Sequence, residues 1–208
     1  LEEMMVQGYP FEVPEKYSNL PQLKGRATVV IDTTKGPMTA ILDGYSAPVT
    51  AGNFVDLVKR GFYDGLPFTR TDSSFVVQTG DPEGPEQGFV EGGKTRTIPL
   101  EVLVEGDAEP IYEFTTEELG IYPAKPALPF SSYGTMAMAT SPDEPNGASS
   151  QFFFLLFEAD LTPAGANLLD GRYAVFGYLV EGQDVLAELT KGDKIKSAKV
   201  VEGLENLV

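Results

Sequence analysis

Phe68-Thr-Arg-Thr-Asp-Ser-Ser-Phe-Val-Val-Gln-Thr-Gly-Asp81 is the stretch from which the rest of the fold can be worked out. Its pattern predicts two short strands, residues 67–71 and 75–79, joined by a polar turn. Arg70 and Gln78 lie near the middle of these strands. The stretch therefore predicts a rigid surface that carries a cation and an amide on adjacent strands.

Alternation along the second strand places its side chains on two faces. We expect Phe75 and Val77 on one face, and Val76 and Gln78 on the other. Such a surface can bind a ligand through polar and apolar contacts together. The simpler alternative is structural: Arg70 pairs with an acid, and the glutamine bonds to the backbone.

Composition narrows the classes of function. The chain of 208 residues suits one domain, or one domain with an extension. Its net charge of −16 argues against binding to a phosphate backbone or to an anionic membrane. No apolar run is long enough to span a bilayer. We therefore expect neither nucleic acid binding nor membrane insertion.

The absence of Cys and His limits the chemistry. Without Cys, the chain has no thiolate nucleophile and no sulfur metal site. Without His, it has no histidine general base and no His-ligated zinc. We expect no metal and no cofactor. Any reaction must use carboxylates or proceed without proton transfer near neutral pH.

Six further strands and two helices follow from the patterns in the rest of the chain. The strands are expected at 25–33, 37–43, 134–139, 151–157, 173–178 and 194–202, and the helices at 48–60 and 183–190. Hairpin-like spacing with inserted helices predicts a mainly β fold, either an antiparallel barrel or a sandwich, with helical covers.

The region 81–118 carries eleven acidic residues against two basic ones, a net charge of −9. One hypothesis is a surface for a cationic partner. The alternative is a solvated loop that aids solubility, which charge alone favours. Within this region Gly88 to Thr95 matches the spacing of a phosphate-binding loop. Nucleotide binding is not expected, because no strand precedes Gly88 and no helix follows Thr95.

Four ordered segments resemble the cyclophilin family. They are the opening stretch, Gly134-Thr-Met-Ala-Met-Ala139, Ser150-Gln-Phe-Phe153, and Leu169-Asp-Gly with Val175-Phe-Gly177. The resemblance implies a closed eight-stranded antiparallel barrel capped by two helices over residues 25–208. It also implies an inserted acidic loop at about 81–132, and a linker or tail of an upstream domain at 1–24.

The resemblance further implies binding of proline-containing peptides and interconversion of their cis and trans forms. Rotation about an amide bond has a barrier of about 18–20 kcal/mol. A guanidinium near the prolyl nitrogen would stabilise the twisted amide without acid–base chemistry. By resemblance, Arg70 has this catalytic role, and Gln78 holds a substrate carbonyl. The other substrate-binding positions implied are Phe75, Val76, Ala139, Thr140, Gln151, Phe153, Leu168, Leu169 and Tyr173.

Four of these positions depart from the usual pattern of the family. Thr140 stands where Asn is usual, Val76 where Met is usual, Leu168 where many members carry Trp, and Tyr173 where His is usual. The change at Leu168 removes an indole donor and a large flat wall. We therefore expect weak or absent isomerase activity. An active isomerase, serving as a foldase, is the alternative.

Within that family, the chain more closely resembles the multidomain type of cyclophilin in the plant thylakoid lumen. This likeness implies a chloroplast lumenal protein that serves assembly or maintenance of photosystem II. The implied partners are proline-containing segments, photosystem II subunits, and the chain's own N-terminal helical domain. An enzyme and a binding module both remain open. An open groove with Arg70 exposed favours the enzyme, and a groove filled by the chain itself favours binding or autoinhibition.

Overall fold

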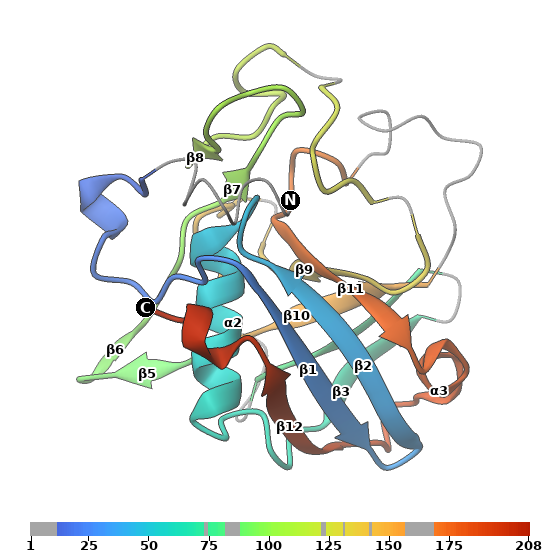
Figure 1. The fold of residues 1–208 in the computed structure, drawn as a ribbon. Helices are drawn as coiled ribbons and strands as arrows, with labels where there is room; N and C mark the ends of the chain where they lie inside the picture. The colour runs from blue at the N-terminus through green and yellow to red at the C-terminus, as the bar shows by residue number, and fades with distance from the viewer. Residues whose placement is uncertain are drawn as a thin grey trace.

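The computed structural model describes residues 12–72, 75–81, 88–121, 124–130, 132–141, 143–156 and 169–208. Eight strands form one antiparallel sheet that curls into a barrel, in the order β12-β1-β2-β11-β9-β10-β4-β3 (Figure 1). The strands are β1 Arg26–Thr33, β2 Gly36–Asp43, β3 Phe68–Asp72, β4 Val76–Thr79, β9 Thr135–Met138, β10 Phe152–Leu155, β11 Val175–Glu181 and β12 Ile195–Glu202. The predicted fold class is confirmed.

The barrel closes through a short contact between its two end strands. β12 and β3 share no ladder, but an isolated bridge pairs Pro67 with Lys194 just before each strand. Backbone hydrogen bonds from Phe68 N to Asp193 O (3.1 Å) and from Ile195 N to Leu66 O (2.9 Å) flank this bridge. The barrel is therefore nearly closed rather than continuously bonded around its circumference.

The barrel core follows from alternation along the strands. β1 and β2 bury every second residue, as half-buried strands do. The helix α2 (Pro48–Lys59) packs its buried Phe54 against Phe152 of β10 and Phe176 of β11, with ring centroids 5.0 and 5.1 Å apart. The second helix, α3, spans Gln183–Glu188. Among the described residues, no helix is long and apolar enough to cross a membrane.

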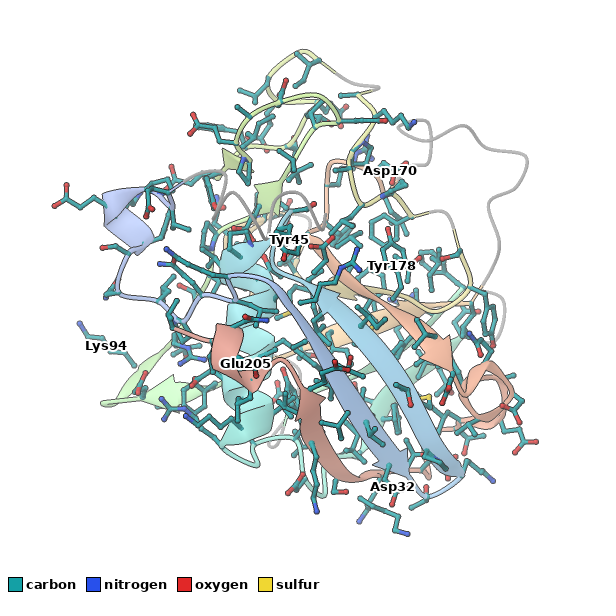
Figure 2. All side chains as sticks on the ribbon, viewed as in Figure 1. Asp32, Tyr45, Lys94, Asp170, Tyr178 and Glu205 are labelled. Carbon is teal, nitrogen blue, oxygen red and sulfur yellow. The ribbon has the colours of Figure 1, made fainter. Side chains whose placement is uncertain are left out.

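The acidic region adds two small hairpins to the barrel. β5 (Val90–Glu91) pairs with β6 (Lys94–Thr95), and β7 (Glu101–Val102) pairs with β8 (Ile111–Tyr112). The β5–β6 hairpin occupies the segment with phosphate-loop spacing, and Lys94 at its tip points away from the body (Figure 2). Short 3₁₀ helices lie near the two ends of the described chain, η1 at Glu15–Tyr17 and η2 at Leu204–Asn206.

A carboxylate from this acidic region caps α2. The residue before the helix, Ala47, offers no side-chain hydrogen bond to the exposed backbone N–H groups of the first turn. Glu101, only 1% exposed, accepts hydrogen bonds from Val49 N (3.2 Å) and Thr50 N (2.9 Å), and from the hydroxyls of Thr50 (2.8 Å) and Tyr112 (2.6 Å). Burial raises the pKa of Glu101. One acid of the insertion thus anchors it to the helix, where the helix dipole favours negative charge.

Replacing this anchor is expected to destabilise the domain. Glu101→Gln puts an amide N–H₂ among four donors, so at least one buried donor loses its acceptor. We expect the free energy of unfolding in urea to fall by about 2–4 kcal/mol. Glu105→Gln is the matched control, because Glu105 is exposed and its ion pair in the described part of the chain is with exposed Lys125. It is expected to cost less than about 1 kcal/mol. Equal effects of the two variants would contradict the capping role.

Candidate functional site

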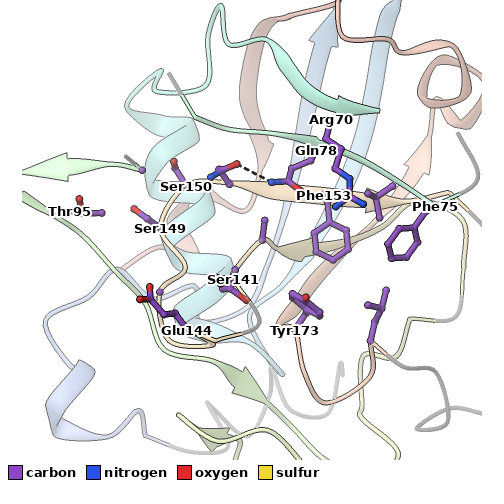
Figure 3. A pocket seen from close by; sticks show the side chains of 17 residues that line it. Arg70, Phe75, Gln78, Thr95, Ser141, Glu144, Ser149, Ser150, Phe153 and Tyr173 are labelled. Carbon is purple, nitrogen blue, oxygen red and sulfur yellow. Dashed lines mark hydrogen bonds between the residues drawn. The ribbon is translucent and has the colours of Figure 1, made fainter. Parts of the chain in front are cut away.

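A groove of about 620 Å³ lies over β3, β4 and β10, on the face of the sheet opposite the barrel core (Figure 3). The segment Phe152-Phe-Phe-Leu155 shows how the two faces divide. Phe152 and Phe154 join the main core, whereas Phe153 and Leu155 join a second apolar cluster beneath the groove. This run of buried apolar residues therefore contributes to both the barrel core and the cluster beneath the groove, because successive side chains point to opposite faces.

The register of the sheet brings the predicted polar and apolar residues into one row. Arg70 of β3 lies opposite Gln78 of β4, and Gln78 lies opposite Phe153 of β10. The row continues through Ala137 of β9 to Val175 of β11. The cation, the amide and the aromatic ring thus lie on neighbouring strands at the same level of the sheet.

Arg70 is exposed at one end of this row. Its guanidinium carbon lies 5.7 Å from the centroid of the Phe75 ring, and Figure 3 shows the side chain directed toward Phe75 and Phe153. The prediction that Phe75 shares a face with Val77 is wrong. Phe75 packs on the groove cluster, because it precedes β4 in a turn where its N–H bonds to Asp72 O (2.9 Å). Alternation does not extend into that turn.

Two amides are joined in the groove wall. Gln78 Nε2 donates a hydrogen bond to Gln151 Oε1 (2.9 Å), the dashed line in Figure 3. The backbone carbonyl of Gln151 in turn accepts a hydrogen bond from Ala139 N (3.0 Å). The side-chain bond fixes the orientation of the Gln78 amide, which points a polar group into the groove beside the apolar slot.

The apolar slot is built around the ring of Phe153. This ring is 5% exposed, lies parallel to Phe130 at 6.0 Å, and meets Tyr173 edge-on at 5.7 Å. Phe130 is held in turn by a hydrogen bond from its N–H to the carboxylate of buried Asp170 (2.8 Å). Leu169 packs on the same cluster. The slot is thus a rigid aromatic surface with polar groups at its edge.

The groove continues into a polar half that the sequence interpretation missed. Ser150 is fixed there, because Tyr63 Oη donates to its carbonyl (2.8 Å) and its own Oγ donates to Gly80 O (2.6 Å). Burial raises the pKa of Tyr63, so its hydroxyl remains a donor. The turn residues next to Gln151 were the available signal. The lining residues not predicted are Gly88, Thr95, Ser141, Glu144, Gly147, Ser149 and Ser150.

Ten of the eleven predicted site residues line this one groove: Arg70, Phe75, Val76, Gln78, Ala139, Thr140, Gln151, Phe153, Leu169 and Tyr173. Leu168 lies outside the described residues. The roles assigned to these side chains stay predictions. In the part of the chain that the structure describes, no group of three or more potential ligands could hold a metal ion.

The fold and this groove define a protein of the cyclophilin class. The chain belongs to that family, because the model described as "Cyclophilin type peptidyl-prolyl cis-trans isomerase/CLD" matches residues 28–205. A cyclophilin structure from Cryptosporidium parvum aligns with a TM-score of 0.61 and 21% identity, over 85% of this chain and 98% of that one. A second structure of that protein, in the presence of the dipeptide Ala-Pro, aligns with a TM-score of 0.60 and 22% identity, over 84% of this chain and 99% of that one. Both show the fold.

Two curated relatives refine the assignment. The chain is 58% identical to the putative thylakoid lumen peptidyl-prolyl cis-trans isomerase sll0408 of Synechocystis, over 100% of this chain and 55% of the relative. It is 55% identical to CYP38, chloroplastic, of Arabidopsis thaliana, over 100% of this chain and 49% of the relative. The chain spans about half the length of these relatives. They confirm the predicted thylakoid lumen localisation. The domain boundaries proposed from the sequence stay predictions.

Removing the support beneath the slot is expected to loosen it. Phe130→Ala deletes a buried ring that stacks on Phe153, so the free energy of unfolding is expected to fall by about 3–5 kcal/mol in urea titrations. Phe114→Ala is the control, because Phe114 is 48% exposed, and it is expected to cost less than about 1 kcal/mol. A cost for Phe130→Ala as small as the control would show that the stacked rings do not support each other.

Proposed function

We propose that the groove binds proline-containing segments of thylakoid lumen proteins and that Arg70 catalyses slow cis–trans isomerisation of the bound prolyl bond. One observation carries this proposal: Arg70, Gln78 and Phe153 lie opposite one another on three adjacent strands. A proline ring fits the apolar slot at Phe153, and its amide would then lie beside the exposed cation.

Isomerisation requires only that the barrier to rotation about the X–Pro amide bond be lowered. The two forms of an X–Pro bond are close in energy, and their interconversion is slow because the amide is conjugated. When the bond twists, the lone pair localises on nitrogen and can accept a hydrogen bond from the Arg70 guanidinium. Gln78 holds the neighbouring carbonyl, so the acyl part stays fixed while the amide rotates.

Slow turnover is the expectation because the slot departs from the usual family pattern. Tyr173, where His is usual, meets Phe153 edge-on and shapes one side of the slot. The alternative is an isomerase of ordinary rate. Exposed Arg70 and a groove that no described segment fills favour it, as do the isomerase names of both relatives.

Exchange NMR with an Ala-Pro peptide tests the catalytic role. We expect wild type to speed the exchange and Arg70→Ala to lower the catalysed rate by about 100-fold, or to background, because a transition-state contact is lost. Peptide affinity is expected to change much less. Arg26→Ala is the matched control, because Arg26 is also exposed on a strand but does not line the groove. An unchanged rate in Arg70→Ala would refute the role of Arg70.

A protease-coupled assay in parallel with an ordinary cyclophilin separates the two alternatives. Equal turnover that depends on Arg70 would refute slow catalysis and establish the active isomerase. Binding without catalysed exchange in wild type would instead support a binding module that has lost turnover.

We further propose that the segments bound belong to photosystem II subunits, which rests on the resemblance to lumenal multidomain cyclophilins. Proline-containing lumenal segments of these subunits are expected to bind in NMR titrations. Their signals are expected to map to the groove, around Phe153 and Gln78. The same segments with Pro replaced by Ala are expected to bind at least about tenfold more weakly, because the slot then lacks its ring. No dependence on proline would contradict the proposal.

A further inference from the structure

The polar half of the groove is assembled from two segments outside the barrel sheet rather than from one ladder. Gly88 precedes the β5–β6 hairpin and Thr95 ends it, whereas Ser141, Glu144 and Ser149 belong to the connection between β9 and β10. Figure 3 shows Thr95, Ser149 and Glu144 facing this half of the groove. Because these two segments are far apart in sequence, contacts outside the barrel sheet must hold them together.

Arg96 connects these two segments to α2. Its side chain is 8% exposed. Nε and Nη2 donate hydrogen bonds to Asn53 Oδ1 (3.1 and 2.9 Å), and Nη1 donates to Asp56 Oδ2 (2.8 Å). The guanidinium also lies over the ring of Phe89, 4.7 Å from its centroid. Three hydrogen bonds and an aromatic face therefore fix one buried cation against the helix.

The backbone of Arg96 transmits this anchoring to the groove wall. Ser149 Oγ donates to Arg96 O (2.6 Å) and accepts a hydrogen bond from Phe89 N (2.9 Å). Asn53 completes the ring, because its Nδ2 donates to Ser149 O (2.7 Å) while its Oδ1 accepts from Arg96. The network thus joins α2 to the two segments that carry Gly88, Thr95 and Ser149.

We infer that Arg96 is a positioning residue that sets the shape of the polar half of the groove and so determines binding of the residues that flank the proline. This inference rests on the proposed function of the groove. Arg96 does not line the groove, and acts only through Ser149 and the hairpin. The slot is built from Phe153 of β10 and the side chains packed on it, and no described contact joins these side chains to Arg96, so the slot is expected not to depend on Arg96.

Because Arg96 supports the polar half of the groove and not the apolar slot, its replacement is expected to weaken binding of long peptides selectively. Arg96→Met removes the hydrogen bonds to Asn53 and Asp56 but leaves the apolar stem of the side chain. In NMR titrations, the Ala-Pro dipeptide is expected to keep its affinity within about twofold. Two longer peptides carry three alanines either before or after Ala-Pro. The one that reaches the polar half is expected to bind Arg96→Met about tenfold more weakly than it binds wild type. Arg96→Lys keeps the positive charge on a single donor nitrogen and is expected to restore part of the affinity.

Arg60→Met is the matched control. Arg60 also pairs with Asp56 (2.9 Å) and lies over Phe89 (5.4 Å), but no described contact links it to Ser149. Its loss is expected to leave binding of both kinds of peptide unchanged. If Arg96→Met is too unstable to study, Arg96→Lys allows the same comparison of short and extended peptides, with a smaller expected loss for the extended one.

Three outcomes overturn the inference. Equal weakening of short and extended peptides would assign Arg96 a general structural role. Unchanged binding of all peptides would show that the network does not shape the groove. If wild type binds the dipeptide and the extended peptides alike, the polar half takes no part in binding, although the proposed function stands. Only a wild type that binds none of these peptides would refute the proposed function itself.

Discussion

The register of β4 between β3 and β10 determines which side chains meet in the groove. Because side chains along a strand alternate between faces, a slip of one residue would turn Gln78 into the barrel and bring Val77 out. The barrel core opposes such a slip, since Val77, Phe152 and Phe154 are all fully buried on the other face. Packing inside the barrel therefore fixes the polar geometry outside it. Arg70 reaches the same level of the sheet only because of an irregularity in the β3–β4 pairing between Phe68 and Arg70.

Helix α2 links this barrel to the acidic region through two buried charges of opposite sign. Its apolar face inserts Phe54 into the aromatic core, so packing on the barrel holds the helix in place without contacts from the insertion. The first turn then holds the carboxylate of Glu101, and Asn53 and Asp56 further along hold the guanidinium of Arg96. Each buried charge has several hydrogen-bonding partners, which is the condition under which burial of a charge is tolerated. The insertion is thus positioned by polar contacts, although most of its acids are exposed.

These anchors also explain why the sequence predicted the fold better than the site. Strands and helices follow from periodicity, and Arg70, Gln78 and Phe153 stand in recognisable segments. Glu101 could not be distinguished among eleven acids of its region, because capping a helix about 50 residues away depends on folding rather than on local pattern. The same holds for Ser149 and Arg96, which become neighbours only through α2. Phe75 was misplaced for a smaller reason: a turn residue does not follow the alternation of the strand that it precedes.

The proposed chemistry of the groove and the groups that respond to protons lie in different parts of the domain. A guanidinium keeps its proton under physiological conditions, and the chain has no His, so the groove needs no group that titrates near neutral pH. Stabilisation of a twisted amide by Arg70 would then be the same in mildly acidic and neutral solvent. Protons act instead on carboxylates, and burial raises the pKa of Glu101 at the joint between the insertion and α2. Protonation of this carboxylate would therefore act on the attachment of the insertion to α2 and not on Arg70.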